Sequence, residues 1–151
     1  MRRGFGWRKR CFEAFAMGGR MTAARRAIIE VFANSRGHLT AEEVFWKVKT
    51  IYPAVGIATV YRTLEFMVQQ GFLAKYSINN VFKYELLDED NPHHHHLICV
   101  KCGKIEDFSD FLDEEKELVE KIEKKIEKKY KFKVQSHRLD FYGVCEECQG
   151  K

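Results

Sequence analysis

The feature that most constrains this chain is a pair of Cys-x-x-Cys motifs, one beginning at Cys99 and the other at Cys145. Thiolate sulfur is a preferred ligand of zinc, and four thiolates suit a closed tetrahedral site with no open position for chemistry. In a reduced cytosol such pairs bind metal more often than they form disulfides. We therefore predict a structural Zn²⁺ site that pins the C-terminus back onto the first pair. Its ligands would be Cys99, Cys102, Cys145 and Cys148.

Four consecutive histidines, His93 to His96, run into the first cysteine pair through two apolar residues. Imidazole nitrogen is another ligand type that transition metals prefer. The apolar pair indicates a short strand, on which alternate side chains point to opposite faces. His94 and His96 would share one face, and His93 and His95 the other, so the run divides into two candidate sites. A purification tag or a set of solvated surface histidines fits less well, because the run is internal and adjoins two cysteines.

The charge is unevenly distributed along the 151 residues, a length that allows one ordinary domain or two small ones. Residues 1–75 carry 13 Lys and Arg against 5 Asp and Glu, whereas residues 76–151 carry 13 against 17. A basic half joined to an acidic, ligand-rich half suggests a nucleic-acid-binding module fused to a sensing or assembly module, although ordinary surface variation is the alternative. No apolar run approaches the ~20 residues of a membrane span. We expect a cytoplasmic protein with no membrane segment.

Three helices with clear boundary signals are predicted between Thr22 and Gly71, after a short basic helix over residues 7–18. Thr22 is a suitable N-cap. Thr40 and Glu43 fit a capping box, and the helix that they begin stops before Pro53. The third helix spans about residues 58–70, and glycine suits the left-handed position after a helix. The apolar positions predicted to face inward are Ile28, Val31 and Phe32, then Val44, Phe45, Val48 and Ile51, then Val60, Leu64, Met67 and Val68.

Two strand-like runs, residues 72–78 and 81–86, follow and are joined by Asn79-Asn80. Asparagine tolerates positive φ, so this junction predicts a hairpin turn. Three helices and a hairpin make a winged helix-turn-helix, whose third helix enters a DNA major groove. A plain three-helix protein-interaction module is the alternative. The residues expected to contact DNA are Arg25, Thr59, Tyr61 and Arg62, with Thr63 also exposed on the third helix.

The C-terminal half predicts a strand over residues 104–108, a helix over 111–129 and a final strand over 132–142. The alternation of the final strand is irregular, which suggests that both faces are covered, as a partner chain would do. The fifth cysteine, Cys11, is expected to be a small apolar side chain rather than a reactive thiol. The apolar side of the helix, expected to be buried, consists of Leu118, Val119, Ile122 and Ile126.

Three motifs now allow a comparison with known families: residues 56–62 (GIATVYR), residues 93–108 (HHHHLICVKCGKIEDF) and residues 136–143 (SHRLDFYG). In these the chain resembles the ferric uptake regulator (Fur) superfamily of bacterial metal-dependent repressors. The resemblance implies an α+β homodimer that binds double-stranded, A/T-rich inverted-repeat DNA. It implies an N-terminal winged helix-turn-helix DNA-binding domain over residues 1–87 and a C-terminal α/β dimerisation domain over 88–151.

The resemblance also implies two metal sites beside the structural zinc. The sensory site would use His38, Glu85, His94, His96 and Asp107. A second site would use His93, His95, Glu114 and His137. The stretch between Glu85 and the histidines is longer than in most relatives, and Asp88 or Glu89 could replace Glu85.

Members of this superfamily respond to different signals, so several functions stay open. An iron-responsive repressor, with Fe²⁺ at the sensory site, is the first reading. An aspartate at the position of Asp107 also occurs in the peroxide-sensing branch, and Mn²⁺ or Zn²⁺ sensors are further alternatives. The sensory set has no cysteine, which disfavours the zinc sensors that carry one. A metalloenzyme or a metal-storage protein is disfavoured, because neither explains the basic half and no general base stands beside an open site.

Overall fold

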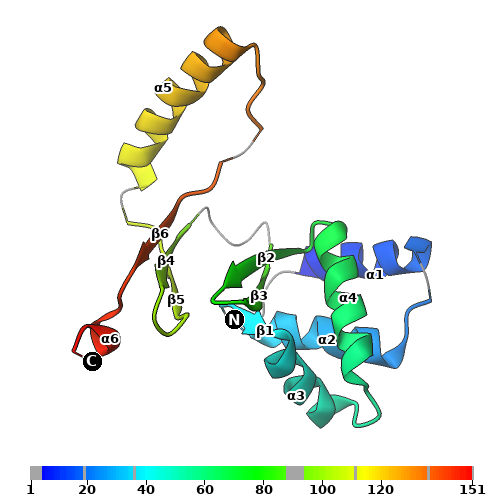
Figure 1. Ribbon diagram of the computed structural model, residues 1–151. Helices are drawn as coiled ribbons and strands as arrows, with labels where there is room; N and C mark the ends of the chain where they lie inside the picture. Colours follow the sequence, from blue (N-terminus) through cyan, green and yellow to red (C-terminus); the bar gives the residue numbers. More distant parts are fainter. Residues whose placement is uncertain are drawn as a thin grey trace. The chain divides into compact units, whose positions relative to one another are not determined.

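The computed structural model describes residues 5–18, 20–35, 37–87, 94–110, 112–135 and 137–150. The chain divides into two compact units, Met1–Pro92 and His93–Lys151, and helices accompany a small sheet in each, which confirms the α+β class (Figure 1). The boundary predicted between residues 87 and 88 adjoins residues 88–93, which lie outside the described part, and it stays a prediction. Among the described helices, none combines the length and hydropathy that a membrane crossing requires.

The first unit is a winged helix-turn-helix, as predicted. Its strands form a sheet in the order β1-β3-β2, and both pairs are antiparallel. The short strand β1, which was not predicted, pairs with the wing and so joins the helices to the hairpin. The elements are α1 (Phe5–Gly18), α2 (Ala23–Asn34), β1 (Leu39–Thr40), α3 (Ala41–Ile51), α4 (Ile57–Gln69), β2 (Leu73–Ile78) and β3 (Val81–Leu86).

Local sequence signals set these boundaries. The Thr22 hydroxyl accepts a hydrogen bond from the Arg25 amide at 3.3 Å, as an N-cap does. The Glu43 amide donates to the Thr40 hydroxyl at 3.1 Å while the Glu43 carboxylate accepts from the Thr40 amide at 2.7 Å, which completes the predicted capping box. Gly71 has a φ of 72°, and the Asn79-Asn80 turn has φ values of 50° and 63°. Each boundary was predicted because its cause lies within a few residues.

The core of the first unit draws on all four helices and on the wing. Cys11 and Phe15 anchor α1 in it, and the ring of Phe15 stacks on that of Phe66 at a centroid distance of 4.4 Å. The prediction that Ile51 faces inward is wrong: it is 54% exposed. Ile51 is the last residue of α3, and Val55, beyond the end of the helix, is the residue of this stretch that enters the core.

The second unit is built on a thinner sheet, in the order β5-β4-β6. The central strand β4 pairs antiparallel with β5 and parallel with β6. The predicted long final strand is wrong, because β6 covers only the last part of it. The pairing with β4 runs from His96 and Asp140 to Cys99 and Gly143, and an irregular alternation in the sequence does not show where such pairing begins. The elements are β4 (His95–Cys99), β5 (Ile105–Phe108), α5 (Leu112–Tyr130), β6 (Asp140–Gly143) and α6 (Glu146–Gln149).

Little apolar surface is covered within the second unit. Among its described residues, Ile98 and Cys99 are the buried hydrophobic ones. The stripe of α5 that was expected to be buried is largely open, since Leu118 is 59% exposed and Ile122 is 45% exposed, while Val119 and Ile126 are half-buried. That expectation is wrong for a single chain. The helical period identified the stripe correctly, but a single three-stranded sheet does not supply a surface to cover it.

Candidate functional site

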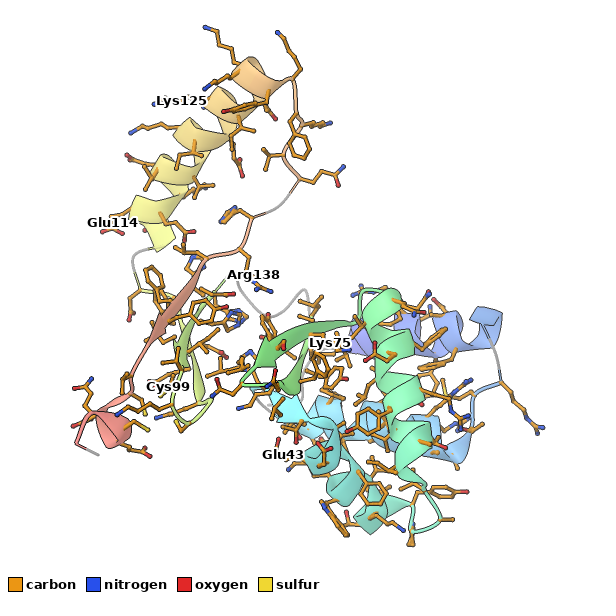
Figure 2. The ribbon with its side chains drawn as sticks, in the orientation of Figure 1. Glu43, Lys75, Cys99, Glu114, Lys125 and Arg138 are labelled. Atoms are coloured by element: carbon orange, nitrogen blue, oxygen red, sulfur yellow. The ribbon has the colours of Figure 1, made fainter. Side chains whose placement is uncertain are left out.

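The four cysteines of the two Cys-x-x-Cys motifs converge at one end of the second unit, where Figure 2 labels Cys99. Cys99 ends β4 and Cys102 lies in the following turn. Cys145 is the N-cap of α6, and Cys148 lies within that helix. Their four sulfur atoms all lie within 4.8 Å of one another, and Cys102 Sγ is 3.7 Å from Cys145 Sγ. Zinc–sulfur bonds of about 2.3 Å put tetrahedral sulfur atoms about 3.8 Å apart. The cluster therefore fits a zinc ion in size and in donor chemistry.

The backbone around the cluster favours thiolate at one sulfur. The Cys145 amide donates to Cys99 Sγ at 3.4 Å. Hydrogen bonds from the amides of Cys102 and Cys145 lower the pKa of Cys99 to about 6, whereas hydrogen bonding to Cys145 and burial raise the pKa of Cys148 to about 12. The pKa of Cys99 is thus lowered toward the thiolate, which is the form that a metal binds.

In the first unit, His38 and Glu85 lie together between the helices and the wing. His38 Nε2 is 3.4 Å from Glu85 Oε2, and both side chains are buried. Tyr76 on β2 donates its hydroxyl to the same carboxylate oxygen at 2.9 Å, and its ring meets the His38 ring edge-on at 5.2 Å. The winged-helix unit thus brings together its two predicted sensory ligands, and the tyrosine is a neighbour that the sequence alone did not suggest.

In the second unit, His94 immediately precedes β4 and His96 lies on it, and their ring centroids are 5.0 Å apart, as the predicted alternation requires. Asp107 on β5 is directly across the sheet from His96, and Asp107 Oδ1 is 4.0 Å from His96 Nε2. This unit therefore contributes two imidazoles and one carboxylate. Nitrogen and oxygen donors of this kind suit divalent iron, manganese or zinc, so the residues fit the ion that the family implies.

His95 faces the opposite side of β4 and meets α5. Its Nε2 contacts Glu115 Oε2, and His137 Nε2 lies 3.2 Å from Glu115 Oε1. The acidic residues beside these histidines are Glu115 and, 3.6 Å from His137 Nδ1, Glu123. The predicted Glu114 is exposed at the start of α5 instead (Figure 2). Adjacent helical positions point about 100° apart, so only one of two neighbouring glutamates can face the sheet. His93, the remaining predicted ligand, lies outside the described residues, as do Asp88 and Glu89.

The helix α4 presents the candidate DNA-contacting side chains. Tyr61 and Arg62 are exposed and Thr59 is half-buried, whereas Thr63, which was expected to be exposed, is buried at 3%. Thr63 falls on the core side because it lies three residues after Val60, close to one helical turn. The Tyr61 hydroxyl donates to Glu42 Oε1 at 2.6 Å, which lowers the pKa of Glu42 and raises that of Tyr61. Sequence reasoning had no signal for this contact, since the two residues belong to different helices.

Arg25, the fourth candidate for DNA contact, is held within the first unit. Its guanidinium lies over the Phe15 ring at 4.9 Å from the centroid, and Nη1 donates to the Arg20 carbonyl at 2.7 Å. This position ties α1 to α2. The neighbouring Arg26 is exposed, with its guanidinium 5.7 Å from the Phe12 ring. Of these two arginines, Arg26 is therefore the more accessible to a partner such as DNA.

Comparison with known proteins agrees with this arrangement of two units. The sequence profile of the Ferric uptake regulator family matches residues 16–142. The chain belongs to the ferric uptake regulator family. It is 39% identical to the ferric uptake regulation protein of Bacillus subtilis over 87% of each chain. It is 35% identical to the peroxide operon regulator of the same organism, over 89% of this chain and 87% of the relative.

The solved ferric uptake regulator of Helicobacter pylori, described as having three functional metal binding sites, has the same fold. It superposes with a TM-score of 0.78 at 27% identity, covering 99% of this chain and 97% of that one. Other solved relatives hold iron or zinc. Fur family members are metal-dependent transcriptional regulators that bind DNA as dimers, so this chain is a regulator of that kind. The resemblance drawn from the three sequence motifs is confirmed.

Proposed function

We propose that this Fur family protein is an iron-responsive repressor whose sensory site combines ligands from both units. The observation that supports this most directly is the donor chemistry. His38 and Glu85 meet in the first unit, and His96 faces Asp107 in the second, so the set contains nitrogen and oxygen donors. The cysteines of the second unit are gathered in the four-sulfur cluster. Soft thiolates favour zinc, whereas mixed imidazole and carboxylate sets accept iron and manganese as well as zinc.

Under this proposal each ligand set has its own task. Cys99, Cys102, Cys145 and Cys148 hold a structural Zn²⁺. His38, Glu85, His94, His96 and Asp107 form the sensory site, which takes Fe²⁺ or, in other branches of the family, Mn²⁺ or Zn²⁺. His95, His137 and Glu115 would form a second site, with His93 as a further candidate. Residues 1–87 act as the DNA-binding domain and residues 88–151 as the metal-binding dimerisation domain.

The mechanism follows from the division of the sensory ligands between the units. His38 and Glu85 of the first unit and His94, His96 and Asp107 of the second would hold the divalent ion, which would supply the positive charge that links them. These residues then restrict the angle between the DNA-binding and dimerisation domains in each subunit. The two α4 helices of a dimer must lie about one DNA turn apart to enter successive major grooves. Metal affinity and DNA affinity are therefore coupled, each raising the other.

The DNA contacts in this proposal come from Arg25, Thr59, Tyr61 and Arg62. Tyrosine can contact a thymine methyl group or a phosphate, and arginine can read guanine or hold a phosphate. A twofold dimer favours an operator with inverted-repeat symmetry, and we propose an A/T-rich inverted repeat.

The experiment that tests this function is an anaerobic fluorescence anisotropy titration on A/T-rich inverted-repeat DNA. Fe(II), Mn(II) and Zn(II) are added separately to protein that retains only its tightly held zinc. We expect Fe(II) to raise DNA affinity about tenfold or more, a coupling of about 1.4 kcal/mol. His96→Ala should remain a dimer and lose this response. A metal response that survives in His96→Ala would refute the sensory-site assignment.

A peroxide sensor is the second candidate, and Asp107 favours it, because the peroxide-sensing branch carries aspartate at this position. Here histidines beside bound iron would be oxidised by hydrogen peroxide, which would release the DNA. Treatment of the Fe(II)-loaded and Mn(II)-loaded forms with peroxide separates the two functions. Added oxygen on a sensory histidine, detected by mass spectrometry in the Fe(II) form alone and accompanied by loss of DNA binding, would establish the peroxide sensor. An unmodified protein that keeps its DNA would support the iron-responsive repressor.

A further inference from the structure

His96 occupies a special position in the sheet of the second unit. It lies on the central strand β4, directly opposite Asp107 of β5 on one side and Asp140 of β6 on the other. The two aspartates therefore approach the same imidazole from neighbouring strands. Only the pairing register creates this arrangement, because the three residues are far apart in the sequence.

The two aspartates meet different nitrogen atoms of the ring. Asp140 Oδ1 is 3.1 Å from His96 Nδ1, which is hydrogen-bond distance. Asp107 Oδ1 is 4.0 Å from His96 Nε2. The Asp140 side chain is 6% exposed and that of Asp107 is 42% exposed. The buried carboxylate thus contacts one nitrogen, while the accessible carboxylate stands near the other.

The second oxygen of Asp140 is also engaged. Arg138 Nη2 donates to Asp140 Oδ2 at 2.7 Å (Figure 2 labels Arg138 on the segment that leads into β6). By holding this second oxygen, the arginine fixes the plane of the carboxylate. An ionised carboxylate can only accept hydrogen bonds. Nδ1 of His96 must therefore be the protonated nitrogen if the contact is to be favourable.

We propose that Asp140 is a positioning residue for the sensory site: it holds His96 in the Nδ1–H tautomer and presents the Nε2 lone pair toward the side of Asp107. This inference rests on the proposed function of His96 as a sensory ligand and adds a residue to it. Histidines that bind metals commonly donate their other ring N–H to a carboxylate, which fixes the tautomer and orients the ring. Arg138 contributes by holding Asp140, and Asp140 itself is not a ligand.

The first test needs no variant. Long-range ¹H–¹⁵N NMR of the zinc-retaining protein, at mildly alkaline pH and without added metal, reports which ring nitrogen carries the proton. The His96 signals are assigned by their absence from the His96→Ala spectrum. We expect a single Nδ1–H tautomer for His96. A predominant Nε2–H tautomer or an even mixture of tautomers would overturn the proposal.

The second test measures metal affinity by calorimetric titration of Mn(II) into the zinc-retaining dimer. All proteins carry His137→Ala, so that the second candidate site does not contribute. Asp140→Asn keeps the side-chain volume, but its amide can donate to Nδ1 and so favour a proton on Nε2. We expect it to weaken Mn(II) binding by about tenfold to a hundredfold, the range seen for outer-shell partners. The control Asp110→Asn, at an exposed aspartate in the turn after β5, should leave binding unchanged.

The outcomes separate this inference from the function on which it rests. If His96→Ala abolishes Mn(II) binding while Asp140→Asn binds like the control, the sensory site stands and the positioning role is refuted. If His96→Ala binds Mn(II) normally, the proposed function itself fails. If Asp140→Asn does not fold, the tautomer measurement on the unmodified protein still decides the matter.

Discussion

The two units of this protein are stabilised in different ways. The first unit buries a continuous cluster of twenty residues that includes Phe15, Phe32 and Leu64. Among the described residues of the second unit, the buried hydrophobic side chains are Ile98 and Cys99, and the buried polar side chains are His95 and His96. The first unit is stabilised by apolar packing. The second has its polar metal ligands where a core would otherwise be.

This difference suggests that the second unit depends on metal binding and dimerisation for its stability, whereas the first does not. A sheet of three short strands with an open helix stripe does not bury enough apolar area to offset the entropy of ordering its chain. A bound zinc ion and a second subunit can supply the missing free energy. We therefore expect the exposed apolar side chains of the second unit to be the surface that dimerisation covers. They include Leu97, Leu118, Ile122, Phe141 and Tyr142.

The largest effect is expected from Cys102→Ser, which removes one of the four sulfurs. Structural zinc contributes about 10–16 kcal/mol of apparent binding energy in small zinc domains, so we expect zinc, dimer and order in the second unit to be lost together. The helices of the first unit should persist. Metal analysis, light scattering and hydrogen exchange mapped onto the two units measure this. Cys11→Ala, which removes a cysteine outside the cluster, should keep zinc and dimer, and a zinc-replete Cys102→Ser dimer would contradict the comparison.

A smaller effect on stability should distinguish the packed core of the first unit from the apolar stripe of α5. Leu64→Ala, in the packed core of the first unit, should lower its free energy of unfolding by about 3 kcal/mol. Leu118→Ala, on the open stripe of α5, should leave the unfolding of the first unit unchanged and weaken the dimer. Urea unfolding at several protein concentrations separates these results, because only the second depends on concentration. Equal destabilisation by both variants would show that the units do not differ in this way.

Two buried tyrosines allow a controlled comparison, because one contacts a proposed metal ligand and the other does not. Tyr76 donates to Glu85, a proposed ligand, whereas Tyr84 on the adjacent strand donates to Glu65, which is not one. Each Tyr→Phe change should lower the stability of the first unit by about 1 kcal/mol, the usual value of one hydrogen bond. Only Tyr76→Phe should also weaken Mn(II) binding, by about tenfold. Comparable metal affinities in the two variants would mean that Tyr76 stabilises the fold but does not support Glu85 as a ligand.

The smallest effect concerns the thiol of Cys11. Burial raises the pKa of Cys11 to about 12, so hardly any thiolate is present at neutral pH. We expect this thiol to resist alkylation in the folded, zinc-loaded protein. After zinc is chelated, the exposed Cys102 should react quickly while Cys11 stays protected. Peptide mapping by mass spectrometry gives the order, and early modification of Cys11 would contradict the packed state of the first unit.

Much of the fold could be predicted because its causes are local. The N-cap at Thr22, the capping box at Thr40 and the turn at Asn79-Asn80 each depend on residues within one turn of the chain, and the structure contains all three. The alternation that brings His94, just before β4, and His96 to the same side follows from the geometry of any extended chain. The paired Cys-x-x-Cys motifs identified their cluster because thiolates in such pairs have few other uses in a reducing environment.

Other features were decided only by the tertiary structure. Asp140 and Asp107 meet His96 through the pairing of three strands, and Glu115 rather than Glu114 faces His95 through the rotation of α5. The open stripe of α5 has the same sequence pattern as a buried one. Periodicity shows which residues share a face but not what lies against that face. The sequence by itself therefore determined the helices, the turns and the chemistry of the ligands. Strand register and packing between distant segments selected which residues stand beside those ligands, because such contacts depend on parts of the chain that no local pattern describes.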